Sequence, residues 1–140
     1  RRAMDDAGLE RRSHWVIRDV HNLDESITLI VERLGVSDRP TAYYCSDDGL
    51  ALHMIYALQQ MGLEVPDDMA LVGHGDNIDE PAASILGLTT VVQDTTTTAN
   101  LAVAAVIDQM DGKPTAPSKR IPSRLLVRRS CGGVTATASG

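Results

Sequence analysis

The chain has 140 residues, of which 43% are hydrophobic, 23% charged and only 3% aromatic. These values predict one globular unit whose core is built from aliphatic side chains and Met. The formal net charge of −6 argues against a protein that binds phosphate backbones non-specifically through a basic surface. No apolar run approaches the roughly 18 residues of a membrane-spanning helix.

The first part of the chain alternates helix and strand signals. Residues 1–7 are typical of the end of a helix, and Gly8 suits the left-handed position that follows one. The segment His-Trp-Val-Ile-Arg at 14–18 predicts a short strand. Asn22 supplies N-cap chemistry for an amphipathic helix over 24–34, in which apolar residues recur at helical spacing.

The remainder continues this alternation. Gly62 and Gly112 each close a predicted helix, and Pro66 prevents the first of these helices from resuming. Residues 132–140 predict a flexible tail. The pattern predicts an α/β fold with a parallel sheet and helices on both faces. The predicted helices are 48–61 and 97–111, and the strands are 42–45, 69–73, 88–92 and a last one within 121–129.

Two adjacent carboxylates, Asp47 and Asp48, stand between a predicted strand and a predicted helix. Ligands of open α/β sheets bind at the carboxyl ends of the strands, so both are candidates for accepting hydrogen bonds from a polar ligand. Either residue also suits a helix cap, because the first turn of a helix leaves backbone N–H groups free. Two carboxylates are nevertheless more than one cap needs.

Three further polar residues follow predicted strands. His21 comes after the strand at 14–18, Asp76 comes after Gly75 at the end of the third strand, and Gln93 ends the fourth. An amide can both donate and accept a hydrogen bond, which suits a sugar hydroxyl. The alternatives are exposed loop positions for His21 and Gln93 and a turn cap for Asp76.

Neither a metal site nor a catalytic set is predicted. No P-loop, nucleophile elbow or Ser-His-Asp spacing is present. A phosphate-accepting receiver domain needs a Lys at a strand end, whereas Lys113 and Lys119 lie in a Pro-rich loop. We therefore expect no enzyme activity and no cofactor. The clustered His and acidic residues after the third strand match no strong metal-ligand spacing: His74, Asp76, Asp79 and Glu80.

The cysteines indicate the redox compartment of the protein, and the first residue indicates whether the chain is a piece of a longer one. Cys45 and Cys131 lie far apart and favour reduced thiols in a cytoplasmic protein over a disulfide. The chain begins at Arg1, inside a predicted helix and without an initiator Met. We therefore expect a piece of a longer protein.

Three segments carry a recognisable pattern. They are Pro-Thr-Ala-Tyr-Tyr-Cys-Ser-Asp-Asp-Gly-Leu-Ala from Pro40, Gly-Leu-Glu-Val-Pro-Asp-Asp-Met-Ala-Leu-Val-Gly-His-Gly-Asp from Gly62, and Leu-Thr-Thr-Val-Val-Gln-Asp from Leu88. Their order and gaps resemble those of the lactose/galactose-repressor (LacI/GalR) family of bacterial transcription regulators over residues 1–131. The family's motifs are P-T-A with N-D, V-P-x-D with V-G-[F/Y]-D-D, and L-T-T-x-x-Q.

The resemblance implies one lobe of a periplasmic-binding-protein-like, type I effector domain. Residues 1–131 would be the C-terminal part of that domain, with the DNA-binding helix-turn-helix and most of the N-terminal lobe outside this chain. A small ligand would bind between the lobes and alter affinity for operator DNA. A solute-binding protein of a sugar transport system shares the lobe architecture and is the alternative, although the V-P-x-D and L-T-T-x-x-Q motifs favour the regulator.

By position, the resemblance implies effector contacts. Asp47 stands where the family has a ligand-contacting Asn, and Gly75 stands where many members have a sugar-binding Asp. These departures remove one donor and one acceptor, which disfavours a plain hexose or pentose. A different sugar, a sugar acid or another polar metabolite stays open as the ligand. The other implied contacts are Asp48, Asp76, Gln93 and His21.

The resemblance also implies a homodimer with the helix 48–61 in its interface. Helix 97–111 would pack on the N-terminal lobe. Without that lobe, we expect the apolar face of this helix to be covered by self-association or rearrangement. The implied interface residues are Leu50, Met54, Ile55, Leu58 and Met61.

Overall fold

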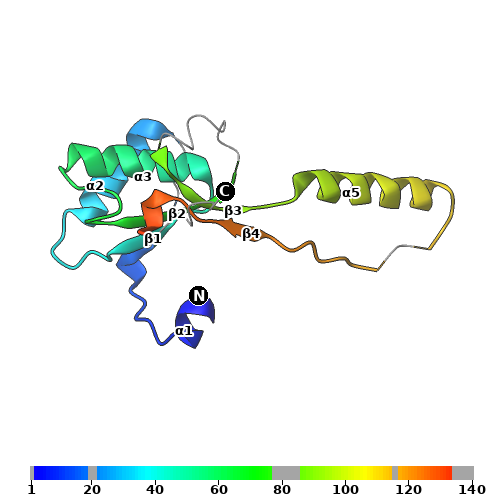
Figure 1. Cartoon of the computed structure of the whole chain (residues 1–140), viewed down its shortest axis with the longest axis horizontal. Helices are drawn as coiled ribbons and strands as arrows, with labels where there is room; N and C mark the ends of the chain where they lie inside the picture. The colour runs from blue at the N-terminus through cyan, green and yellow to red at the C-terminus, as the bar shows by residue number, and fades with distance from the viewer. Residues whose placement is uncertain (1, 19–21, 77–85, 115–116, 134–140) are drawn as a thin grey trace, which may run out of the picture.

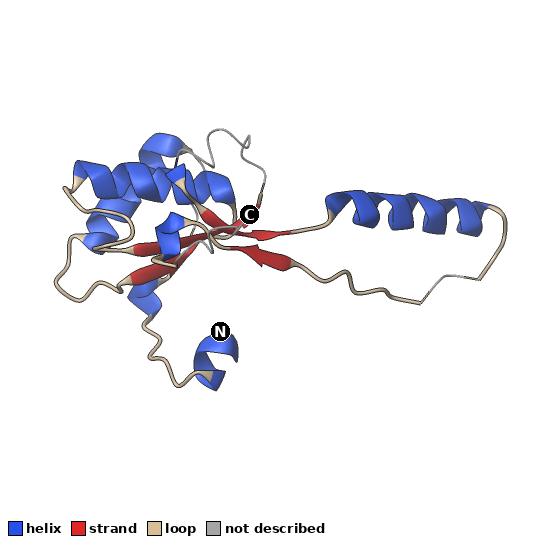
Figure 2. Cartoon of the chain, viewed as in Figure 1, coloured by secondary structure: helices blue, strands red, loops and turns tan. Residues whose placement is uncertain are grey.

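The computed structural model describes residues 2–18, 22–76, 86–114 and 117–133. Helices and strands alternate along this part of the chain, as the hydrophobic pattern predicts (Figures 1 and 2). The elements are α1 (Arg2–Asp6), the 3-10 turn η1 (Ser13–Trp15), α2 (Leu23–Leu34), β1 (Ala42–Tyr44), α3 (Asp48–Gln60), β2 (Ala70–Gly75), β3 (Thr89–Val92), α5 (Thr95–Met110), β4 (Arg124–Leu126) and the 3-10 turn η2 (Arg129–Cys131).

The four strands form one sheet in the order β1-β2-β3-β4. The first three are parallel, as expected, whereas β4 runs antiparallel to β3, so the sheet is mixed and mainly parallel. The reversal follows from the path of the chain. After β3 the chain leaves the sheet, forms α5, and returns alongside β3 as β4 (Figure 1).

The core lies between the sheet and helices α2 and α3. Helix α3 packs on β2, and α2 packs against α3. Tyr43 and Leu71 are register partners on the core face, while their neighbours Tyr44 and Val72 point to the other face. Helices α1 and α5 bury none of their side chains. The described helices therefore cover one face of the sheet, and the expected helical layer on the second face is not among them.

Helix α3 places most of its apolar residues in the core of this chain. Met54 is 4% exposed, Ile55 8% and Leu58 0%. We expected these three residues in a dimer interface, but their burial within one chain assigns them to its own core. Leu50 and Met61 are only partly buried and pack against the edge of this core.

The strand expected at 14–18 is wrong: this segment forms the turn η1 and then runs on with Val16 exposed. Trp15 explains the difference. Its indole Nε1 donates a hydrogen bond to the carbonyl of Asp38 at 2.8 Å, and the Arg12 guanidinium lies 5.1 Å from the ring centroid. These contacts tie the segment to the loop before β1 and leave it outside the sheet.

Helix α5 begins at Thr95, two residues before the predicted start, because Asp94 caps it. The Asp94 carboxylate accepts hydrogen bonds from the backbone N–H and the hydroxyl of Thr97. Both hydrogen bonds lower the pKa of Asp94 below its usual value, and the bond from the hydroxyl has the larger effect. The helix extends away from the sheet (Figure 1). It leaves several large apolar side chains exposed, namely Val103, Val106, Ile107 and Met110.

The burial of α3 predicts a large stability difference within one helix. Leu58→Ala removes a side chain that is 0% exposed and should lower the free energy of unfolding by about 2–5 kcal/mol. Gln60→Ala, on the exposed side of the same helix, should change it by less than about 0.5 kcal/mol. Urea denaturation followed by circular dichroism measures both values. Equal losses would contradict the assignment of Leu58 to the core.

Candidate functional site

The carboxyl ends of β1, β2 and β3 lie at one edge of the sheet, because these three strands are parallel. Asp47 follows β1, His74 and Asp76 lie at the end of β2, and Gln93 follows β3. Contacts across the strand ends join some of these residues. The rings of Tyr44 and His74 meet edge to face with centroids 6.2 Å apart, and Gln93 Nε2 lies 3.1 Å from His74 Nε2.

Asp47 is the N-cap of α3. Its Oδ1 accepts a hydrogen bond from the backbone N–H of Leu50 at 2.9 Å. The side chain is partly exposed, and a carboxylate can accept more hydrogen bonds than the one that this cap uses. The capping role and a ligand contact are therefore compatible for this residue.

Asp48 is 1% exposed, and its Oδ1 accepts a hydrogen bond from the Thr90 hydroxyl at 2.6 Å. It lies directly over Gly73 of β2, where an added Cβ would overlap the same oxygen. A ligand in solution does not reach a carboxylate buried in this way. We expected Asp48 to contact an effector, and its burial assigns it instead to the frame that holds α3, β2 and β3 together.

Asp76 adopts a left-handed backbone conformation with φ 54°, which Asp tolerates better than most residues. Its Oδ1 lies 3.4 Å from Nη2 of Arg128, whose Nη1 also donates to the Leu88 carbonyl at 2.8 Å. Sequence reasoning missed Arg128. The available signal was a basic residue inside the segment 121–129, which was expected to contain the last strand.

His74 was considered only as a metal ligand, yet it stands between Tyr44 and Gln93. Tyr44 is 61% exposed and was not singled out. His21 lies outside the described residues. Across residues 2–18, 22–76, 86–114 and 117–133, no group of three His, Cys, Asp or Glu side chains is arranged to hold a metal ion.

Both cysteines are free thiols. Cys45 directly follows β1 and is 6% exposed. The pKa of its thiol is raised to about 12, mainly by burial and to a smaller extent by the negative charges of Asp47 and Asp48. The thiolate is therefore scarce near neutral pH, and Cys45 is a poor nucleophile. Cys131 lies elsewhere, where its Sγ accepts a hydrogen bond from the Thr89 hydroxyl at 3.1 Å.

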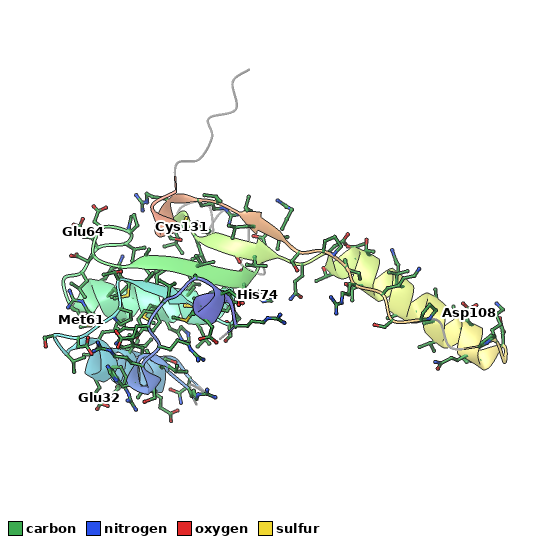
Figure 3. The ribbon with its side chains drawn as sticks, turned by 90° about the horizontal axis from the view of Figure 1, so that it is seen from below. Glu32, Met61, Glu64, His74, Asp108 and Cys131 are labelled. Atoms are coloured by element: carbon green, nitrogen blue, oxygen red, sulfur yellow. The ribbon has the colours of Figure 1, made fainter. Side chains whose placement is uncertain are left out.

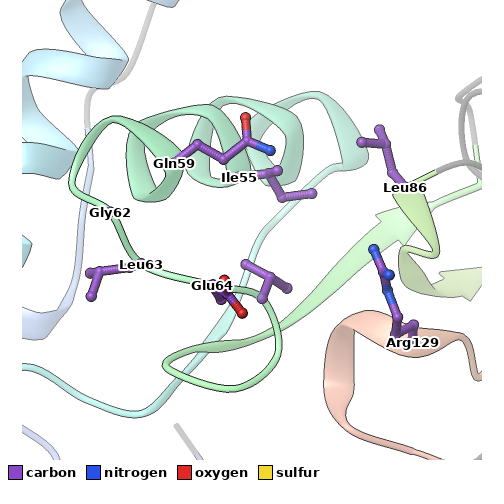
Figure 4. Close-up of a pocket in the computed structure, with 8 residues that line it drawn as sticks. Ile55, Gln59, Gly62, Leu63, Glu64, Leu86 and Arg129 are labelled. Carbon is purple, nitrogen blue, oxygen red and sulfur yellow. The ribbon is translucent and has the colours of Figure 1, made fainter.

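A depression of about 620 Å³ lies at the opposite end of the sheet (Figure 4). Figure 3 shows Met61 and Glu64 toward that end and His74 toward the end from which the chain leaves for α5. The depression is therefore separate from the strand-end residues. Its lining comes from α3, the loop that follows α3, the residue Leu86 before β3, and the turn η2. The lining residues are Ile55, Gln59, Gly62, Leu63, Glu64, Val65, Leu86 and Arg129. No helix in the described part of the chain is long and apolar enough to cross a membrane.

The contact between Asp48 and Thr90 predicts a sharp difference between two substitutions. Thr90→Val removes the donor to a buried carboxylate and should lower the free energy of unfolding by about 1–3 kcal/mol. Thr90→Ser keeps the hydroxyl and should lower the free energy of unfolding by clearly less than Thr90→Val does. Chemical denaturation at neutral pH measures the pair, and a Ser variant as unstable as the Val variant would contradict a stabilising hydrogen bond.

Comparison with known proteins gives the family. The model of the periplasmic binding protein-like domain matches residues 1–131. The HTH-type transcriptional repressor PurR of Proteus mirabilis is 29% identical over 130 residues, which are 92% of this chain and 38% of that repressor. PurR of Vibrio campbellii is 37% identical over 93 residues, which are 66% and 28% of the two chains. The chain thus spans well under half the length of these relatives.

Solved structures agree with the sequence match. The cellobiose complex of the transcriptional regulator CelR is 25% identical with a TM-score of 0.79, covering 92% of this chain and 39% of that chain. A LacI-family regulator from Sanguibacter keddieii is 29% identical with a TM-score of 0.79, covering 95% and 50%. These relatives support the regulator rather than a transport protein. The chain therefore belongs to the periplasmic binding protein-like domain family, in the form that LacI-family transcriptional regulators carry.

Proposed function

We propose that this chain supplies one wall of the effector site of a cytoplasmic transcriptional regulator. The observation that carries the proposal is that Asp47, His74 and Gln93 all lie at the carboxyl ends of the parallel strands β1, β2 and β3, in a domain of this family. Residues 1–131 would form the C-terminal part of the effector domain. A helix-turn-helix outside this chain would bind operator DNA, and effector binding would change its affinity through the geometry of the lobes.

The chemistry of this wall favours a small polar ligand with several hydroxyl groups. Asp47 offers a partly exposed carboxylate, and Gln93 offers an amide. Gly75 offers no side chain, so the site lacks an acceptor at that position. CelR was solved with cellobiose, which supports a sugar or a sugar derivative as the class. No covalent step is needed, so we propose a binding protein without enzyme activity or a cofactor.

The effector proposal is tested on the intact protein that carries this sequence. A thermal-shift screen of sugars and sugar acids should yield a ligand that raises the melting temperature, because binding to the folded state stabilises it. Calorimetry with that ligand should show weaker affinity for Asp47→Ser than for the wild type. Serine keeps a helix cap while removing the carboxylate, so lost affinity reports the contact rather than the fold.

Asp47→Asn is the matched partner of this variant. It also keeps the cap and adds an N–H donor, so it should alter the preference among ligands of the screen. Unchanged affinity in both variants would remove Asp47 from the site. A screen without any stabilising sugar or sugar acid would contradict the proposed ligand class.

We also propose a homodimer in which α3 faces a second copy. Since Met54 and Leu58 lie in the core, the exposed side of α3 must make this contact. Tyr56 is 49% exposed on this helix, and Gln59 lines the depression beside it. Aromatic side chains of this kind are enriched at the centres of protein interfaces.

The dimer proposal predicts that Tyr56→Lys shifts the protein toward monomer, because a charge would be buried at the interface. Multi-angle light scattering across a concentration series measures the shift. Met110→Lys, on the 81% exposed end of α5, tests the alternative that α5 makes the contact. If only Met110→Lys dissociated, the interface would lie on α5 and the assignment to α3 would be wrong.

A further inference from the structure

The amide of Gln93 and the imidazole of His74 meet through two nitrogen atoms. Gln93 Nε2 lies 3.1 Å from His74 Nε2. An amide nitrogen only donates, so the ring nitrogen facing it must be the acceptor. In this arrangement His74 is neutral, with its proton on Nδ1. This state differs from that of His14, whose Nε2 faces the Asp38 carboxylate at 3.2 Å and therefore carries a proton.

The backbone explains why the two side chains meet. His74 of β2 is the register partner of Val91 in β3, and Gln93 stands two residues further on the same side of the sheet. Tyr44 of β1 lies on the other side, where its ring and the imidazole meet edge to face. The imidazole is therefore held between an aromatic ring and the amide, and it is only partly exposed.

We propose that His74 is a positioning residue that sets the hydrogen-bonding character of Gln93 in the effector site. By accepting from Nε2, it leaves Oε1 as the free end of the amide. No hydrogen bond to Oε1 occurs among the residues that the structure describes. The matching group of the effector must then be a donor, a hydroxyl or an N–H, and a carbonyl or carboxylate would be rejected at this point. The inference rests on the proposed contact between Gln93 and the effector.

Nitrogen NMR of the imidazoles tests the inference on the intact protein that carries this sequence, without any ligand. At a pH of about 8.5, above the ordinary range of imidazole titration, the long-range ¹H–¹⁵N spectrum distinguishes the two neutral tautomers. His74 should have an unprotonated Nε2. His14 supplies the reference for a protonated Nε2. His53 supplies the reference for a protonated Nδ1, because it donates from Nδ1 to Ser26, whose hydroxyl is already donated to the Asn22 carbonyl.

Gln93→Glu provides the decisive variant. The carboxylate has nearly the shape of the amide but only accepts hydrogen bonds, so the His74 Nε2 resonance should move into the protonated range. Gln93→Leu should remove the preference of His74 for one tautomer and give a mixture of the two. The signals of His14 and His53 should stay unchanged, which shows that the fold is intact.

Two results would overturn the proposal: a protonated Nε2 on His74 in the wild type, or the same tautomer in the wild type and in Gln93→Glu. Either result would leave the effector site itself untouched, because the measurement involves no effector. Conversely, a failed ligand screen would leave the tautomer of His74 as measured.

Discussion

A buried carboxylate holds the carboxyl edge of the sheet together. Asp48 begins α3, lies over Gly73 of β2 and accepts a hydrogen bond from Thr90 of β3. A carboxylate out of water is costly unless it is paired, so its position is strongly determined by these neighbours. The start of α3, and with it Asp47, is thereby placed relative to two strands. The ends of these strands carry His74 and Gln93.

The sheet separates two kinds of surface at its two ends. The carboxyl edge gathers polar side chains from three parallel strands, which is the arrangement expected of a ligand site in an open α/β sheet. The opposite end holds the depression beside the end of α3, where apolar and charged residues mix. The proposed effector and the proposed second copy would therefore contact different parts of the molecule, with α3 extending from one to the other.

Helix α5 forms from local sequence features alone, because its side chains are not buried against the rest of the chain. Its N-terminus is capped by Asp94, and its interior contains no Gly or Pro, yet none of its side chains is buried. Exposed Val103 and Met110 mark a face that needs a cover. The same excursion of the chain makes β4 antiparallel, because the chain returns along β3 after the helix.

Local chemistry made much of the fold predictable from the residues. Asn22 and Asp47 cap helices α2 and α3 where the sequence placed helix starts, and Gly62 follows the end of α3 with a positive φ. The segment around Trp15 was mispredicted, because its strand-like composition could not show that the indole would bond to the Asp38 carbonyl. Such a contact joins residues distant in the chain and has no local signal.

The sequence by itself determined the class of fold, the family pattern and the strand-end positions of Asp47, Asp76 and Gln93, because capping and hydrophobic period are properties of neighbouring residues. Only the tertiary structure decided what each side chain does. It buried Asp48 and Leu58, paired Asp76 with Arg128, and brought His74 to Gln93. These outcomes depend on strand order and register, which set the distances between residues far apart in the chain.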